Sequence, residues 1–388
     1  MSGMIRLIEI FVSLPRKILH TMYNNDSRTV ITLDAGGTHF RFSAMRGCEA
    51  VTETFELPTH PNNLAQLLED LRTGFQNIIG QLAEKPVAIS FAFPGPADYP
   101  NGVFPDRLSN FPCFEGGVAL SAYLENQFGL PVFINNDADL FTYGEALAGA
   151  LPMLNDKIRN AGGVKQYHNL IGFILGTGFG IGITSHNQMF MGDNCCSEIY
   201  CTPSKWGQEL IAEEGISLRA VLRYYRELAK DDKADCYKDS YDIYRIAEGA
   251  LVGDQTAAQN AFSRFGEAAG YAIAQAACML DGIIVLGGGV SKAAKFYMPA
   301  LLREIRTEMH TLDGRAMQRV PSAIYNLEDP VEFEAFVKGK TKEINVFGTE
   351  QRILIDTERR LGITLSQLGT SRATAIGAYC FALHALDN

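Results

Sequence analysis

Asp34-Ala35-Gly36-Gly37-Thr38-His39-Phe40-Arg41 is the stretch that says most about the fold of this chain. It joins two apolar runs, Val30–Leu33 and Phe40–Ala44, and this pattern predicts two strands connected by a glycine turn. Paired glycines let a backbone approach a ligand closely, and the bare amide groups of such a turn suit phosphate. An aspartate at a strand end can hold hydrated Mg²⁺, while Thr38 and Arg41 can add phosphate contacts. The same residues also fit an ordinary tight hairpin.

A second element of the same kind follows in the middle of the chain. The apolar run Asn169–Leu175 leads into Gly176-Thr177-Gly178-Phe179-Gly180-Ile181-Gly182, and a return strand is expected over Ile181–Thr184. No Lys-Ser/Thr pair follows and a strand comes next, so this is neither a Walker loop nor a dinucleotide loop. Two such hairpins could clamp one polyphosphate from two sides. Their recurrence also suggests two related halves and favours an α/β fold.

A third glycine turn, Gly287-Gly288-Gly289, follows the apolar run Ile283–Leu286 and precedes a helix expected from about Lys292. Such a turn lets a flat ligand lie against the backbone, and the following helix N-terminus favours anions. A tight packing turn is an equally good interpretation.

Asn136-Asp137 lies between the two hairpins, after a strand predicted over Pro131–Ile134 and before a helix predicted over Asp139–Leu151. A carboxylate at the mouth of a cleft can accept the proton of a hydroxyl group as phosphate is transferred to it. Asn and Asp are also favoured helix N-caps, so the residues alone leave both roles open.

The rest of the chain alternates strands and helices. Val87–Phe93 is predicted as a buried strand that Pro94-Gly95-Pro96 ends. Thr311–Ile353 has the weakest pattern. Helical spacing of apolar residues covers four further stretches: Leu64–Leu82, Ala119–Phe128, Gln208–Lys230 and Thr256–Leu280.

Composition narrows the class of protein. A chain of 388 residues with 47% apolar side chains can form two domains, each with its own core. Acidic residues outnumber basic ones by 44 to 34, which disfavours nucleic acid as a partner. The eight cysteines form no framework typical of secreted proteins, which indicates a reducing compartment and the cytoplasm.

No apolar run reaches the roughly 20 residues of a membrane-spanning helix, so no integral membrane segment is expected. Residues 1–28 are predicted as a helical extension, because Ile5–Tyr23 is apolar with a few basic residues. This extension could pack on the protein or on a partner subunit, or it could be a peripheral membrane anchor.

Taken together and in order, these elements resemble the sugar-kinase branch of the actin-like ATPase superfamily, and most closely the ROK family of repressors and sugar kinases. The resemblance runs from about Thr29 to Leu386. It implies a two-domain actin-like ATPase (ribonuclease H-like) α/β fold with an interdomain cleft. The smaller domain would be residues 29–135 plus 372–388, and the larger domain residues 136–371. Ala373–Leu386 resembles the family's closing helix, which packs on the first domain.

The resemblance also implies an ATP- and Mg²⁺-dependent kinase that phosphorylates a hexose, mostly at the 6-hydroxyl. Glucose or a related or N-acetylated hexose would be the small-molecule partner, and a homodimer is expected. Asp137 would be the general base, and Asp34 would lie near the metal ion. Gly95, Asn110, Asn136 and Glu198 would contact the sugar together with Asp137. The nucleotide would be held by Asp34, Gly36, Gly37, Thr38, Arg41, Gly176, Thr177, Gly178, Gly287, Gly288 and Gly289.

One segment departs from the family pattern. Glu198-Ile199-Tyr200-Cys201 stands where the family has Glu-Ile-Gly-His, so the glutamate is kept and a histidine contact to sugar is replaced. Cys195, Cys196 and Cys201 cluster without a paired Cys-x-x-Cys spacing, which does not favour structural zinc.

Two other functions are compatible with the resemblance. One is a sugar-binding or regulatory protein without kinase turnover, which the altered segment after Glu198 keeps open. The other is a sugar-responsive transcription regulator, but the roughly 28 residues before the first hairpin are too few for a helix-turn-helix unit.

Overall fold

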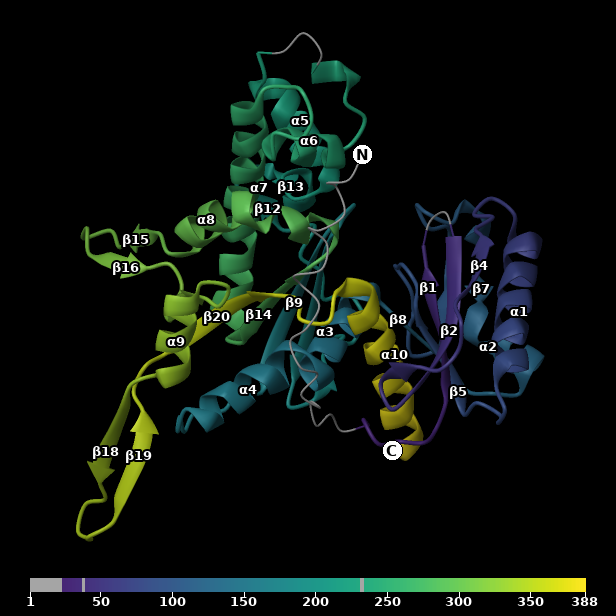
Figure 1. The fold of residues 1–388 in the computed structure, drawn as a ribbon, viewed down its shortest axis with the longest axis horizontal. Coiled ribbons are helices and arrows are strands. Elements are labelled where there is room, and N and C mark those ends of the chain that lie inside the picture. The colour runs from purple at the N-terminus through teal and green to yellow at the C-terminus, as the bar shows by residue number, and fades with distance from the viewer. Residues whose placement is uncertain (1–22, 37–38, 231–233) are drawn as a thin grey trace, which may run out of the picture.

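Two six-stranded sheets organise the protein, and helix α10 (Thr370–Asp387) runs between them (Figure 1). The structure is a computed structural model that describes residues 23–36, 39–230 and 234–388. The first sheet has the order β3-β2-β1-β5-β8, with β4 paired to β2. Its strands are β1 (Val30–Ala35), β2 (His39–Arg46), β3 (Glu49–Ala50), β4 (Phe55–Pro58), β5 (Ala88–Ala92) and β8 (Val132–Asn135).

The second sheet repeats the plan of the first. Its order is β11-β10-β9-β14-β20-β17, where β9 and β10 form an antiparallel hairpin and β14 continues parallel to β9. In the first sheet, β1 likewise pairs antiparallel with β2 and parallel with β5. The expectation of two related α/β halves is confirmed. The strands are β9 (Asn169–Leu175), β10 (Phe179–Ser185), β11 (Gln188–Met189), β14 (Ile283–Gly287), β17 (Ala323–Asn326) and β20 (Arg360–Leu365).

Helices cover both faces of the second sheet. Side chains of α7 and α8 pack on one face, while those of α3, α4 and α9 pack on the other. The helices besides α10 are α1 (Leu64–Gln81), α2 (Leu120–Phe128), α3 (Asp137–Ala148), α4 (Ala150–Asn160), α5 (Leu218–Leu228), α6 (Ser240–Ala247), α7 (Gln255–Leu280), α8 (Ala294–Ile305) and α9 (Pro330–Lys338). Short 3₁₀ turns are η1 (Pro112–Phe114), η2 (Ala212–Glu214), η3 (Ala234–Cys236) and η4 (Gly289–Ala293).

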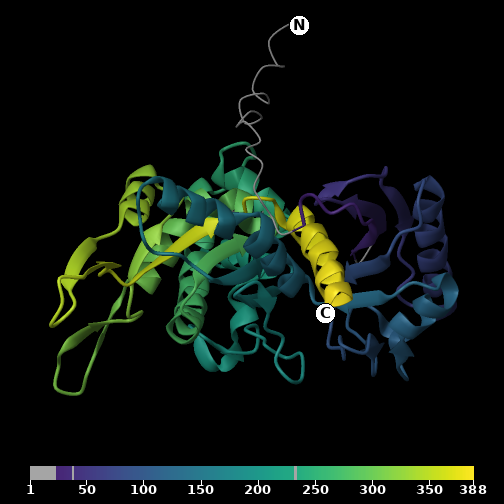
Figure 2. The ribbon, with the colours of Figure 1, turned by 90° about the horizontal axis from the view of Figure 1, so that it is seen from below.

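In the described part of the chain, four two-stranded ribbons lie outside the two sheets. Two of them, β15–β16 and β18–β19, project from the body of the protein (Figures 1 and 2). The strands of the ribbons are β6 (Val103–Phe104), β7 (Val118–Ala119), β12 (Pro203–Ser204), β13 (Gly207–Ile211), β15 (Glu308–His310), β16 (Ala316–Gln318), β18 (Thr341–Asn345) and β19 (Arg352–Asp356).

Local sequence explains where the main helices begin and what they bury. Asn63 caps α1, because its side chain accepts a hydrogen bond from the Gln66 amide at 3.2 Å. The apolar spacing of α1 then places Leu67, Leu71 and Phe75 in the core against the first sheet.

Helix α10 crosses α3 at backbone contact, and two glycines make this possible. A Cβ atom at Gly377 of α10 would overlap the carbonyl oxygen of Leu140, and one at Gly144 of α3 would overlap that of Ala373. Because both residues lack a side chain, the two helices pack closely in the region between the two sheets (Figure 1). Tyr379 of α10 also accepts a hydrogen bond from the Gly47 amide at 2.9 Å, which ties α10 to the first sheet.

Two of the helix predictions made from the sequence were wrong in part. The helix expected over Asp139–Leu151 is two helices, because α3 begins at Asp137 and ends before Gly149, where a Cβ atom would overlap the Glu145 carboxylate. The helix expected over Gln208–Lys230 starts only at Leu218, where Ser217 caps α5. Residues 207–211 instead form β13.

The predicted helical extension lies mostly outside the described residues. Residues 23–28 are described, and they form a turn and an extended segment rather than a helix. The predicted domain boundaries stay a proposal. Among the described residues, no helix is long and apolar enough to cross a membrane.

We predict that Gly377→Ala lowers the free energy of unfolding by about 1–3 kcal/mol, because the added methyl group forces α10 away from α3. Urea denaturation followed by circular dichroism measures this change. Gly80→Ala in α1 is the matched control, since nothing lies within 4 Å of the added atom. Equal stability of Gly377→Ala and the wild type would contradict the backbone contact.

Candidate active site

A cleft of about 620 Å³ lies between the first sheet and α10. Residues from β1, β2, β5, α3 and the first turn of α10 line it, and Ile174 of β9 closes one side. The cleft brings together four of the residues predicted from the sequence, which are Asp34, Arg41, Asn110 and Asp137. Its described lining does not include Gly95, Asn136, Glu198 or the glycines of the second and third turns.

Asp34 is presented to the cleft by the end of β1. It lies opposite Arg41 in the β1–β2 register, and opposite Ala92 of the parallel strand β5. The turn after it is closed by a hydrogen bond from the Gly36 amide to the His39 carbonyl oxygen at 3.1 Å. Gly37 and Thr38, both predicted to contact phosphate, lie outside the described residues.

Arg41 is paired with a neighbour in this structure. Its Nε atom lies 3.3 Å from the Glu56 carboxylate on β4, and about half of its side chain is exposed. To contact a phosphate group, Arg41 would therefore exchange the Glu56 carboxylate for the ligand.

Asp137 is the first residue of α3, and the interpretation of Asn136-Asp137 as a helix N-cap is confirmed, while the role of Asp137 as a base stays a prediction. Asn136 is the N-cap, and its Oδ1 atom accepts a hydrogen bond from the Ala138 amide at 2.8 Å. Asp137 Oδ1 accepts from the same amide at 2.9 Å while its carboxyl group faces the cleft. Desolvation by the cleft walls raises the pKa of Asp137, and the negative charge of Asp34 raises it further.

Two more carboxyl groups lie near Asp137. Burial, followed by the charges of Glu198 and Asp137, raises the pKa of Asp139 to about 8. Burial and the charges of Asp137 and Glu213 raise the pKa of Glu198 to about 7. The side chains of Asp137 and Glu198 are exposed and that of Asp139 is half-buried, and the charge of each ionised group makes its neighbours harder to ionise.

Tyr99 was missed by the reasoning from sequence. Its hydroxyl group donates to the Phe93 carbonyl oxygen at 2.9 Å, and burial raises its pKa while a hydrogen bond with Asn136 opposes that rise. A Cβ atom at Gly95 would lie 2.8 Å from this hydroxyl oxygen, so Gly95 makes room for Tyr99. A lone tyrosine after a proline-rich turn carries no signal in the sequence.

The glycines of the second hairpin serve packing as well as access to ligands. A Cβ atom at Gly182 would overlap the Ala138 carbonyl oxygen, and one at Gly180 would lie 3.1 Å from the Ala138 side chain. The hairpin therefore rests on the first turn of α3, next to Asp137. Gly176 and Gly178 form the turn itself, where the Gly176 amide donates to the Gly178 carbonyl oxygen at 3.0 Å. Thr177 at the tip of this turn is exposed.

The third turn joins β9, β14 and α10. Gly287 packs on the ring of Phe141, and Gly288 has a positive φ of 95° with its amide donating to Thr370 Oγ1 at 2.8 Å. Gly289 has nothing within 4 Å of the position of a Cβ atom, so it is the open residue of the three.

The cysteines near Glu198 are free thiols in this structure. Cys195 is half-buried, whereas Cys196 and Cys201 are exposed. Within the described ranges, no group of three His, Cys, Asp or Glu residues is placed to hold a metal ion.

Known proteins resemble this chain along most of its length. The ROK family model matches residues 30–324. The solved glucokinase of Parabacteroides distasonis is 44% identical, with a TM-score of 0.84 over 94% of this chain and 99% of that one. The glucokinase of Halalkalibacterium halodurans is 26% identical over 293 residues, which is 69% of this chain and 82% of that protein.

The N-acetyl-D-glucosamine kinase of Vibrio cholerae is 29% identical over 161 residues. This match spans 42% of this chain and about half of that protein, namely 48%. With these relatives, the predicted actin-like ATPase fold is confirmed.

We predict that Asp139→Asn flattens the dependence of stability on pH. The folded protein holds the Asp139 proton up to about pH 8, whereas the unfolded chain releases it near pH 4. The free energy of unfolding therefore falls as pH rises through this window, and it falls less steeply in the variant. Urea denaturation between pH 5 and pH 8 measures the slope. Asp156→Asn is the control, because Asp156 lies on the exposed side of α4. An unchanged slope for Asp139→Asn would contradict the raised pKa of Asp139.

Proposed function

We propose that this chain, which belongs to the ROK family and is an ATP-dependent sugar kinase, phosphorylates the 6-hydroxyl group of glucose or of a related or N-acetylated hexose. The observation that carries the proposal is the position of the Asp137 carboxyl group in one cleft with Asp34 and Asn110. The 44% identical glucokinase, which matches nearly the whole chain, supports glucose as the first sugar to test.

Asp137 acts as the general base in this proposal. The sugar hydroxyl oxygen forms a bond to the γ-phosphorus of ATP, the bond from that phosphorus to the bridging oxygen breaks, and ADP leaves. The hydroxyl proton passes to Asp137. The raised pKa of Asp137 brings the carboxylate closer to the range in which a base works efficiently near neutral pH. Its hydrogen bond from the Ala138 amide holds the carboxyl group in place.

Asp34 is the residue that fits Mg²⁺. It offers an exposed carboxylate at the end of β1, and this carboxylate makes no hydrogen bond or ion pair with the residues described in this structure. Magnesium in kinases binds through one or two carboxylates, with water and phosphate oxygens completing its shell, so one aspartate suffices. Mg²⁺ would neutralise the charge of the phosphate groups.

The sugar would lie against Asn110, Asn136 and Glu198. Asn136 uses its Oδ1 atom to cap α3, so its amide nitrogen is the group that can donate to a sugar oxygen. Gly95 belongs to this side of the site through its contact with Tyr99. The glycine turns at Gly176–Gly178 and Gly287–Gly289 would hold the nucleotide. A homodimer in the cytoplasm completes the proposal.

We predict that Asp137→Asn lowers sugar-dependent ATP turnover by at least ~10²-fold, because the amide cannot accept the hydroxyl proton. ADP release from MgATP is measured across a panel of hexoses and N-acetylhexosamines. Asp156→Asn is the control, since that carboxylate lies on the exposed surface of α4. Full turnover in Asp137→Asn would contradict its role as base. A folded wild type that binds sugar without turnover would favour the sugar-binding alternative.

We predict that Glu198→Gln raises KM for the sugar by about 10-fold or more, with a smaller change in kcat, because a charge-assisted hydrogen bond to a sugar hydroxyl is lost. Initial rates at saturating ATP measure this effect. Glu209→Gln on the exposed strand β13 is the control. An unchanged KM would remove Glu198 from the sugar site.

A further inference from the structure

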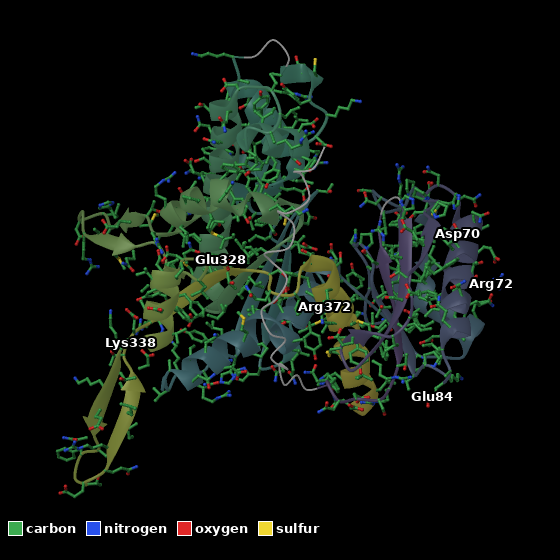
Figure 3. All side chains as sticks on the ribbon, viewed as in Figure 1. Asp70, Arg72, Glu84, Glu328, Lys338 and Arg372 are labelled. Atoms are coloured by element: carbon green, nitrogen blue, oxygen red, sulfur yellow. The ribbon has the colours of Figure 1, made fainter. Side chains whose placement is uncertain are left out.

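Two hairpins project from the side of the protein that lies away from the first sheet (Figures 1 and 2). The short arm consists of β15 and β16, residues 308–318, and the long arm consists of β18 and β19, residues 341–356. Neither arm pairs with another strand among the described residues. Lys338, which marks the foot of the long arm, is labelled in Figure 3.

Exposed apolar side chains are concentrated on these arms. Phe347 at the tip of the long arm is fully exposed, and so is Leu312 at the tip of the short arm. Of the twenty exposed large hydrophobic residues in the described part of the chain, seven lie on the arms, which make up only a small fraction of it. They are Met309, Leu312, Met317, Ile344, Phe347, Ile353 and Leu354.

An arm of this kind lacks a core of its own. A two-stranded hairpin is marginally stable by itself in water, and it becomes stable when an apolar face packs on something else. All five residues of β18 are exposed, as are the first three of β19. Exposed apolar side chains gathered on elements without a core of their own mark an interaction surface.

A groove lined mostly by apolar side chains lies on the second sheet. It has a volume of about 340 Å³ and lies between α4, α9 and the end of β20, on the sheet face opposite α7 and α8. Met153, Leu154, Leu327, Pro330 and Phe333 supply most of its walls. Helix α9 leads directly into the long arm, so groove and arm belong to one continuous segment.

The charges on the long arm allow a second copy to approach. The whole chain carries a net charge of −10, which makes two copies repel each other. Residues 338–356 are close to neutral, with basic Lys338, Lys340, Lys342 and Arg352 against acidic Glu343, Glu350 and Asp356. Glu343 and Arg352 pair with each other at 3.1 Å.

We propose that the long arm of one copy places Phe347 in the α4–α9 groove of a second copy. A two-fold axis makes this contact reciprocal, so each copy supplies one tip and one groove and the assembly closes as a dimer. The long arm, residues 341–356, and the nine residues that line the groove together reach the roughly 20–30 residues that each side of a standard interface contributes. This inference specifies the surface of the proposed homodimer, and it is independent of the sugar chemistry.

Sedimentation velocity at micromolar concentration tests the contact. The wild type sediments as a dimer, and Phe347→Asp or Met153→Lys raises the dimer dissociation constant by at least about 30-fold, as expected for a central anchor residue. Val252→Asp is the control, because Val252 is also an exposed apolar residue but lies between α6 and α7, away from the arms. Circular dichroism and ATP turnover stay at the level of the wild type in all three variants.

A charge swap separates this contact from a general effect of the substitutions. The double variant Phe347→Asp/Met153→Lys places an acidic tip against a basic groove, so it regains the dimer that each single variant loses. A monomeric wild type, single variants that remain dimeric, or a double variant that stays monomeric would each overturn the proposal.

Discussion

The close crossing of α3 and α10 is the constraint on which the rest of the structure depends. Gly144 and Gly377 let the two helices meet at their backbones, and this fixes the start of α3 relative to both sheets. Asp137 stands at that start, where the second hairpin rests on Ala138 through Gly182. The first turn of α10 lines the same cleft, and Thr370 holds the Gly288 amide. One helix contact therefore brings together Asp137, the first sheet and two of the three glycine turns.

The glycines of this protein illustrate why glycine-rich turns are ambiguous in a sequence. Gly182 and Gly287 lack side chains because a helix or an aromatic ring occupies the space, whereas Gly289 faces open space. The first group is explained by packing alone, and the second leaves backbone groups accessible to a ligand. Glycine meets both requirements, because it has no side chain and its backbone conformation is the least restricted. The structure separates these roles residue by residue.

Most of the fold could be predicted from the sequence because short-range patterns of residues indicate the hairpins and the long helices. Short apolar runs joined by glycine turns predicted β1, β2, β9 and β10, and helical spacing predicted α1 and α7. At both ends of Thr311–Ile353 the weak pattern has a physical cause, because the exposed strands β16 and β18 have no buried side to impose a period. Asp139 and Tyr99 could not be assigned to the site from the sequence. Glu198 lies near Asp139 and Asn136 is hydrogen bonded to Tyr99, and each of these partners is distant from its neighbour along the chain. Asp34, Asn110 and Asp137 share a cleft, whereas their chemical roles rest on the family.

The position of α10 has a consequence for how the chain folds during synthesis. Val30 and Met45 of the first two strands share a core cluster with Tyr379, Cys380 and Leu383 of α10. More than 300 residues separate these groups along the chain. The first sheet to leave the ribosome thus keeps one apolar face uncovered while the second sheet is made, and contacts of such long range form slowly. We expect this interval to be the step at which the nascent chain needs protection from aggregation.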